Sequence, residues 1–330
     1  MKGFLLRLAA KLAAGLAMVF TVATFTFFLV HALPGNPGDA AYESYVLGGM
    51  PPELARAKVA VVYGFTSHEP LVDQYLGYLG QLVHGNLGVS ISYSGVPVAD
   101  VIRAAVPWTV LPVLSGLVLS FLVGCAAGVV AAVRRDSRGG GLLSLSGSLM
   151  AGVPSFVLAL LLAFLFHTLW NVLPYGDTSD VTIAPGFTAE YLGSVATHAV
   201  LPVATYALLS YGGWLLTMKS SVASVLGDDF ILAAELRGIA PATRMRYIGR
   251  NAVLPLFTTL ALSVGHMFAG SVLIEDVFDY PGLGNLLLKS IGNRDYPLMG
   301  GAFLLITVTI VVANILAELL YSVIDPRVRR

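Results

Sequence analysis

The segment from Asp229 to Pro255, DFILAAELRGIAPATRMRYIGRNAVLP, separates two long apolar stretches in the second half of the chain. Its first part, residues 229–236, mixes apolar and charged side chains in the pattern of a short helix. Gly238 can adopt the left-handed backbone that ends a helix. Pro241 suits the first turn of a second helix, because its missing N–H has no partner there. The segment therefore predicts a helix, a glycine elbow and a basic second helix that leads into an apolar stretch.

The composition of the whole chain is that of a membrane protein. Apolar residues make up 56% of the 330 residues, charged residues make up 12%, and the mean hydropathy is +0.80. A soluble chain carries about twice that share of charge. The single cysteine, Cys125, lies in an apolar run. One thiol can form neither an internal disulfide nor a cysteine-based metal site, so we interpret Cys125 as a small core residue.

Six stretches are long and apolar enough to cross a bilayer, which takes about 20 residues. They are Leu12–Leu33, Trp108–Val133, Leu142–Trp170, His198–Met218, Ala252–Ile274 and Leu298–Ile324. The first is too long for the apolar part of a signal peptide and is expected to remain in the protein. In the third, Pro154 is expected to bend the helix because it frees backbone carbonyl groups. The fold class predicted is an all-α membrane protein, with residues 1–330 forming a single domain.

The positions of the basic residues predict the orientation of the chain. Most of the 19 Lys and Arg lie on the side of the N-terminus. They are Lys2, Arg7, Lys11, Arg134, Arg135, Arg138, Lys219, Arg237, Arg244, Arg246, Arg250, Arg327, Arg329 and Arg330. Cytoplasmic segments of membrane proteins carry this excess. Both termini and a loop at 219–251 are therefore predicted to be cytoplasmic, and a loop at 34–107 extracytoplasmic.

The long outer loop is expected to contain short helices at 51–63 and 69–84, followed by extended chain at 89–95. The second of these helices has one broad apolar side, so it either lies along the membrane surface or packs on the helix bundle. The loop can serve as a scaffold lid or as a docking surface for an extracytoplasmic partner. We expect it to combine the two roles, and the sequence does not apportion them.

Motifs for hydrolysis or metal chemistry are absent from the sequence. There is no Walker lysine motif, nucleotide-binding glycine fingerprint, HExxH or Ser-His-Asp arrangement. The histidines in or near spans are more consistent with hydrogen-bonded residues than with a metal path; they are His31, His167, His198 and His266. Glu318 is the only charge within a span, and its place near the inner end favours a structural role over proton transport.

Several motifs, in a fixed order, resemble those of one family. They are HALPGNPGD at 31–39, GYLGQLVHGNLGVSI at 77–91, GVPSFVLALLLAFLF at 152–166, IEDVFDYPGLGNLLLKSIGNRDYP at 274–297 and VIDPRVR at 323–329. The chain resembles the inner-membrane permeases of binding-protein-dependent ABC transporters, specifically the dipeptide/oligopeptide type. The resemblance covers nearly the whole length and implies the type I ABC importer permease fold with six transmembrane helices.

The opening segment resembles the coupling loop of these permeases, whose general pattern is EAA, three residues, then Gly. Here Leu232-Ala233-Ala234 and three further residues precede Gly238, and the leading glutamate is absent. The spacing from Gly238 to Asn251 is also one residue shorter than usual for this type. The resemblance implies that the 229–255 loop couples to an ATPase. The residues assigned to this coupling are Asp229, Ala233, Ala234, Glu235, Arg237, Gly238, Ile239 and Arg244.

The resemblance also implies the partners and the substrate. It predicts a non-catalytic subunit of the cell (plasma or inner) membrane that works with a second homologous permease, two ATP-binding-cassette ATPases and an extracytoplasmic substrate-binding protein. ATP and Mg²⁺ would bind the ATPases, with no cofactor on this chain and no nucleic-acid partner. Di- and oligopeptides are the expected cargo, with oligosaccharides or nickel complexes as alternatives. Homodimeric and heterodimeric permease pairing both stay open, as do the residues that line the path.

Two other classes of protein compete with this interpretation. A stand-alone secondary transporter is disfavoured because charges are missing from the centres of the spans. An intramembrane enzyme is disfavoured because no nucleophile, metal set or acid–base pair is evident in the sequence.

Overall fold

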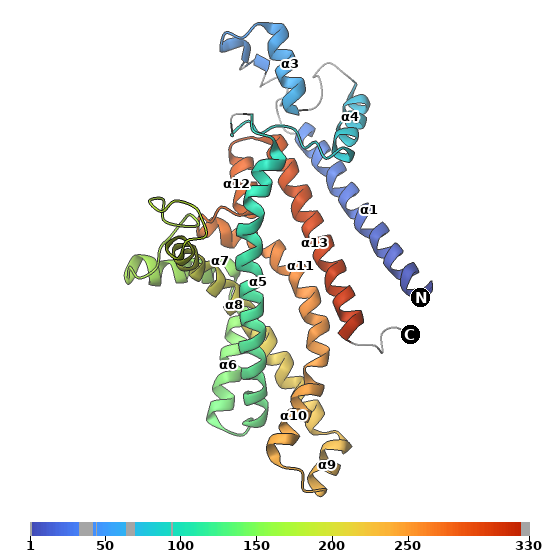
Figure 1. Cartoon of the computed structure of the whole chain (residues 1–330), viewed down its shortest axis with the longest axis vertical. Helices are drawn as coiled ribbons and strands as arrows, with labels where there is room; N and C mark the ends of the chain where they lie inside the picture. Colours follow the sequence, from blue (N-terminus) through green and yellow to red (C-terminus); the bar gives the residue numbers. More distant parts are fainter. Residues whose placement is uncertain (1, 33–41, 44, 64–69, 94, 325–330) are drawn as a thin grey trace. The chain divides into compact units, whose positions relative to one another are not determined.

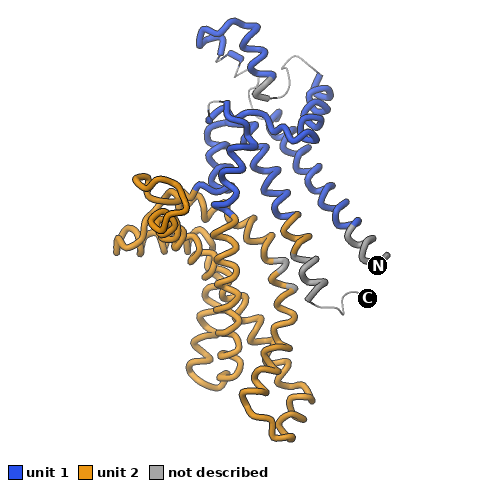
Figure 2. Tube along the Cα trace, viewed as in Figure 1, with its two compact units in different colours: residues 1–109, 281–311 blue, residues 110–280, 312–330 orange. Residues whose placement is uncertain are grey.

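The computed structural model describes residues 2–32, 42–43, 45–63, 70–93 and 95–324. They form two compact units (Figure 2): unit 1 contains residues 1–109 and 281–311, and unit 2 contains residues 110–280 and 312–330. Most of the motif at 31–39, the DPR motif at 325–327 and the side chain of Glu318 lie outside the described residues. The regular elements of the described chain are helices, together with one isolated bridge between Val89 and Pro97, which confirms the all-α prediction.

Unit 1 (Figure 1) is built from helices near the two ends of the sequence. They are α1 (Lys2–Ala32), α3 (Pro52–Tyr63), α4 (Leu71–Val83), α12 (Leu283–Gly292) and the first parts of α5 (Val98–Val133) and α13 (Tyr296–Ile324). Its core packs Val98 and Ile102 of α5 against Leu283 and Leu286 of α12 and Leu298 of α13.

The expected short helices of the first loop are confirmed as α3 and α4, but the expectation of extended chain at 89–95 is wrong. Helix α5 begins at Val98 and so extends beyond the apolar stretch that was predicted to cross the membrane from Trp108, because an apolar pattern marks membrane depth and not the end of a helix. Residues 91–93, expected to be extended, instead lie in a tight turn. Its ends are joined by the hydrogen bond from the Ser90 N–H to the Val96 carbonyl at 2.9 Å.

Unit 2 is organised around α8 (Ala189–Leu226), which packs against several other helices of the unit. Besides α5, they include α6 (Arg138–Gly152), α7 (Ser155–Leu162), α10 (Pro241–Ala252) and α11 (Leu254–Val277). The unit also contains a π-helix, η1 (Ala163–Leu169), the short α9 (Asp229–Leu236) and the remaining parts of α5 and α13. Cys125 is buried in α5, as expected for a core residue.

Glycines allow α8 to approach its neighbours closely. A Cβ at Gly212 would lie 2.2 Å from the carbonyl oxygen of Gly147 in α6, so α6 and α8 meet backbone to backbone. A Cβ at Gly124 of α5 would lie 2.6 Å from the Cβ of Trp214. Small residues at such crossings are typical of membrane helices, whose association depends on close packing. By contrast, a Cβ at Gly213 or Gly270 would meet nothing within 4 Å.

The third predicted span is not one helix. It is broken into α6 and the α7–η1 pair, whose axes differ by 107°. Val153 adopts an extended backbone (φ −81°, ψ 127°), as expected for a residue that precedes proline. Pro154 cannot donate a backbone hydrogen bond to continue α6. The sequence located the bend correctly, but it did not predict the size of the break.

Within the described residues, four helical stretches are long and apolar enough to cross a membrane, and the bent pair would be a fifth. The four are Ala9–Ala32, Val98–Val133, Ala189–Leu226 and Tyr296–Leu316. Helix α11 covers the predicted fifth span at Ala252–Ile274 but is not among them. The count of six therefore stays a prediction, while the multi-pass membrane character is confirmed.

Candidate functional site: the elbow between α8 and α11

The segment Asp229–Ala252, which we call the elbow, folds as its sequence predicts. Helix α9 ends at Leu236, and Gly238 then adopts a left-handed φ of +69°. The Gly238 N–H donates to the Glu235 carbonyl at 2.9 Å, and the Ile239 N–H donates to the Ala234 carbonyl at 3.1 Å. This pair of bonds is a Schellman motif, which satisfies the last carbonyls of a helix and fixes the direction of the exiting chain.

An ion pair closes the elbow from the other side. The Arg244 guanidinium of α10 lies 2.8 Å from the Glu235 carboxylate of α9, so the pair bridges the turn at Gly238. The glutamate is largely exposed and the arginine is mostly covered. A pair of this kind contributes up to about 1 kcal/mol. It therefore fixes the angle between the two helices more than it stabilises the whole fold.

Helix α9 has a buried side and an exposed side. Ile231 and Ala234 are each 6% exposed and face the packed interior of unit 2. On the exposed side, Leu232 is 58% exposed and Leu236 is 80% exposed. The exposed side, which we call the docking face, consists of Asp229, Phe230, Leu232, Ala233, Leu236 and Arg237. Clustered apolar side chains on a surface mark a site of interaction with another protein or a membrane.

The elbow is joined firmly to the long helices. Ile248 and Ala252 of α10 are buried. The Ser221 hydroxyl of α8 donates to the Ala252 carbonyl at 2.7 Å. Val253 is the C-cap of α10 and also the N-cap of α11. A force applied to α9 therefore reaches α8 and α11 through packed and hydrogen-bonded contacts. In Figure 1, α9 and α10 lie together at the lower end of unit 2.

The residues assigned from the sequence all lie in this elbow, but they occupy different environments. Glu235 pairs with Arg244, and Gly238 and Ile239 form the turn. Ala233 lies on the docking face, whereas Ala234 is covered by the chain itself. The sequence-based assignment missed Leu232 and Leu236. A helical projection of 229–236 would have found them, because the positions three and four residues from one another share a side.

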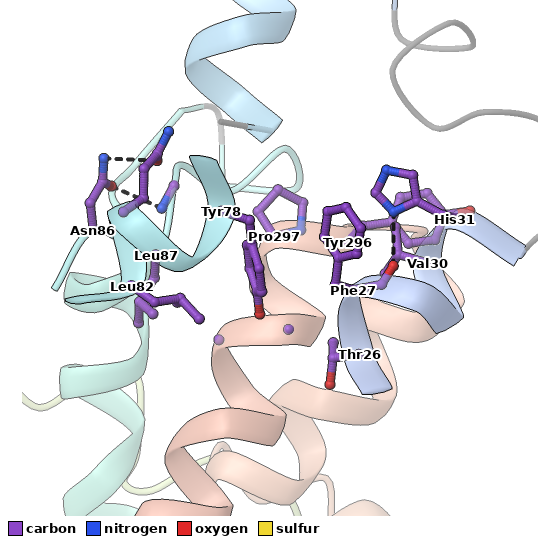
Figure 3. Close-up of a pocket in the computed structure, with 14 residues that line it drawn as sticks. Thr26, Phe27, Val30, His31, Tyr78, Leu82, Asn86, Leu87, Tyr296 and Pro297 are labelled. Carbon is purple, nitrogen blue, oxygen red and sulfur yellow. Dashed lines mark hydrogen bonds between the residues drawn. The ribbon is translucent and has the colours of Figure 1, made fainter. Parts of the chain in front are cut away.

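A separate pocket in unit 1 does not form a site of this kind (Figure 3). It has a volume of about 60 Å³ and is lined by Phe27, His31, Tyr78 and Asn86, among others. Its polar groups have partners: Asn86 donates to Gln81 at 3.1 Å and His31 bonds to the Phe27 carbonyl at 2.8 Å. Burial and then the neighbouring Tyr75 raise the pKa of Tyr78 to about 12, so its phenol stays neutral.

The histidines near the spans have hydrogen-bond partners in most cases. His31, His167 and His198 each use Nδ1 to reach a backbone carbonyl, of Phe27, Leu173 and Ser194 respectively. Among the residues that the structure describes, no cluster of three or more His, Cys, Asp or Glu is placed to hold a metal ion.

Comparisons with known proteins give a consistent result. Residues 124–330 match a family described as binding-protein-dependent transport system inner membrane component. The chain is 32% identical over 333 residues to the dipeptide transport system permease protein DppB of Escherichia coli (strain K12), which covers 93% of this chain and 94% of that protein. It is 30% identical over 322 residues to the oligopeptide transport system permease protein OppB of Haemophilus influenzae, covering 97% of both. It is 28% identical over 309 residues to the oligopeptide transport system permease protein AppB of Bacillus subtilis, covering 93% of this chain and 94% of that protein.

Proposed function

The chain belongs to the family of binding-protein-dependent transport system inner membrane components, and we propose that it is the permease subunit of an ATP-driven importer of di- and oligopeptides. The observation that carries this proposal is the elbow. It presents an apolar face on a short helix, and it leads directly into a long apolar helix. Permease proteins named for dipeptide and oligopeptide transport are similar over nearly the whole chain, which favours peptides over oligosaccharides and nickel complexes.

In this proposal the docking face of α9 sits in a groove on a cytoplasmic ATPase. Short amphipathic helices bind such grooves through apolar side chains. Leu232 and Leu236 supply the apolar contacts, and Ala233 between them lets the two backbones approach. Ala234, which the chain covers, supports the helix from behind.

ATP acts through its different affinity for two states of the assembly. When two ATPases close on ATP, the docked α9 helices move with them. The Schellman turn and the Glu235–Arg244 ion pair hold α10 at a fixed angle to α9, so that α10 moves together with α9. Because α10 continues into α11 and bonds to α8, the motion changes the tilt of the transmembrane helices.

The proposal requires partners that this chain does not contain. ATP and Mg²⁺ bind the two ATPase subunits, which perform hydrolysis, so this chain is not itself an enzyme and carries no cofactor. A second homologous permease completes the translocation path, and an extracytoplasmic binding protein delivers the peptide. The predicted excess of Lys and Arg on one side of the chain supports a cytoplasmic location for both termini and the elbow.

Reconstitution tests this function directly. The chain and its partners are placed in liposomes, and uptake of a labelled dipeptide and a labelled oligopeptide is measured with and without ATP. We expect uptake that requires ATP, the binding protein and both ATPases. Uptake by this chain alone, indifferent to ATP, would identify a secondary transporter and contradict the proposal.

A further inference from the structure

A second pocket, within unit 2, is larger and chemically different from the one in unit 1. It has a volume of about 240 Å³ and lies among the start of α7, the middle of α8 and the middle of α11. Its polar lining consists of Ser155, Tyr206, Ser210, Ser263 and His266. Among its described lining residues, none is an Asp, Glu, Lys or Arg. We call it the α7–α8–α11 pocket.

Two of these polar groups lack a strong hydrogen bond within the described chain. Tyr206 is 2% exposed, yet its hydroxyl makes no well-aligned hydrogen bond among the described residues, although the Ser271 hydroxyl and the Glu275 carboxylate lie near enough to interact with it. Leaving a buried hydroxyl unsatisfied is costly, so a partner is expected in the working protein. The Ser210 hydroxyl reaches the Met267 sulfur at 3.8 Å, and a thioether is a weak acceptor.

The break in the third span supplies further donors at the same place. Helix α7 begins at Ser155, one of the lining residues, and no side chain caps its first turn. The first N–H groups of a helix have no partner within that helix, and the helix dipole makes this end attractive to acceptors. Interrupted membrane helices whose N-termini lie at mid-depth are a general device for binding polar groups of a substrate.

The exposed side of α11 continues this polar surface. Thr259, Ser263, His266 and Gly270 follow at helical spacing, and all four lie at exposed or half-buried positions. Helix α11 packs against α8, which is long and apolar enough to cross a membrane. Polar side chains within a membrane are unfavourable against lipid, and they usually face a water-filled path or protein.

We propose that the α7–α8–α11 pocket is a station of the translocation path, where polar side chains hydrogen-bond to the backbone of the passing peptide. This inference rests on the proposed function. The Tyr206 hydroxyl and the backbone N–H groups in the first turn of α7 donate hydrogen bonds to peptide carbonyl oxygens. The other hydroxyls and the imidazole of His266 accept hydrogen bonds from peptide N–H groups. The described lining itself contains no Asp, Glu, Lys or Arg, and the buried Glu275 carboxylate lies close to Tyr206.

Thiol accessibility tests whether the pocket is a path. In a Cys125→Ala background, His266→Cys and Ser263→Cys are placed in the full transporter in liposomes and treated with a charged, water-soluble methanethiosulfonate. We expect both to react, and excess trialanine to slow the reaction severalfold when ATP cycles. Leu122→Cys, on an exposed apolar position of α5, is the control and should stay unreactive. Unreactive pocket cysteines would mean that lipid or a helix of the second permease covers the pocket, and would overturn the proposal.

Transport kinetics test whether the pocket binds the backbone. Removing one hydroxyl by Tyr206→Phe is expected to raise the KM for trialanine uptake about 3- to 10-fold, the range for one lost hydrogen bond. The matched control is Tyr211→Phe, on the same helix but outside the pocket, where the hydroxyl bonds to Ser146 at 3.3 Å. Its KM should not change.

The two proposals fail in different ways. If the unaltered transporter does not import peptide, the proposed function is wrong. If it imports peptide but Tyr206→Phe keeps the normal KM, or trialanine fails to protect the pocket cysteines, only the assignment of this pocket is wrong.

Discussion

Glu235 and Arg244 form a 2.8 Å ion pair that joins α9 to α10 across the left-handed turn at Gly238. If this pair sets the angle of the docking helix, each single change, Glu235→Gln or Arg244→Gln, should weaken ATPase binding about 2- to 5-fold. That range corresponds to the free energy of a partly exposed pair.

A double-mutant cycle isolates this interaction from other effects of the two side chains. The affinity of the ATPase for the permease in nanodiscs is measured for both single variants and for the combined variant. We expect the combined variant to bind about as well as either single variant. Fully additive losses would show that the two residues act separately, for instance by each contacting the ATPase.

Gly238 should be sensitive to substitution because of its backbone conformation and not because a side chain would be crowded there. Its φ is +69°, while a Cβ at this position would meet nothing within 4 Å. Most side chains cost about 1–2 kcal/mol in this conformation. Gly238→Asp should therefore leave membrane insertion intact but weaken ATPase association, and Gly238→Asn should have a smaller effect.

Gly249 provides the matched control for Gly238. It lies in α10 of the same elbow, a Cβ there would also meet open space, and its φ is not left-handed. Gly249→Ala should be neutral, because alanine favours a helix. Normal copurification and transport with Gly238→Asp would argue against the role given to the elbow.

The docking face predicts that removing one of its apolar side chains lowers the affinity for the ATPase. Leu236 is 80% exposed, so Leu236→Ala should hardly alter the folding of this chain. If the ATPase covers this side chain, the same change should weaken ATPase binding by about 1–2 kcal/mol, roughly 5- to 30-fold. Leu145→Ala, at an exposed position of α6, is the control. Equal ATPase affinity for Leu236→Ala and the unaltered chain would place the docking contact elsewhere.

Structural features that depend on a few neighbouring residues could be predicted from the sequence, and features that depend on packing between distant helices could not. Gly238 and Pro241 act on the backbone within a few residues, so the stop of α9 before Gly238 and the start of α10 at Pro241 were predicted correctly. The start of α5 at Val98 was missed, because Asp100, Arg103 and Pro107 end the apolar pattern although the helix continues through them. The α7–α8–α11 pocket could not be predicted, because the rotation of membrane helices is set by their neighbours and not by hydropathy.

The crossing of α6 and α8 predicts opposite results for two adjacent glycines. A Cβ at Gly212 would lie 2.2 Å from the Gly147 oxygen, so Gly212→Ala must push the two helices apart. Overpacking of this kind costs about 1–3 kcal/mol. Gly213→Ala introduces the same methyl group where nothing lies within 4 Å. Thermal unfolding in detergent should show a lower Tm for Gly212→Ala only; equal Tm values would contradict this helix packing.

In unit 1, Asp295 should hold the turn at 89–97 in place. Its side chain is 0% exposed. One carboxylate oxygen accepts from the Ser90 hydroxyl at 2.5 Å and the Ser92 N–H at 2.9 Å, and the other caps α13 through the Leu298 N–H at 3.2 Å. Asp295→Ala would remove three acceptor contacts and leave buried donors unsatisfied, each at a cost of about 1–3 kcal/mol.

For Asp295→Ala we expect faster protease cleavage within 89–97, measured in sealed vesicles with the protease on the side of this loop. Asp100→Ala, an exposed acid of α5, should leave the cleavage rate unchanged. Equal cleavage of Asp295→Ala and the unaltered chain would show that other contacts hold the turn.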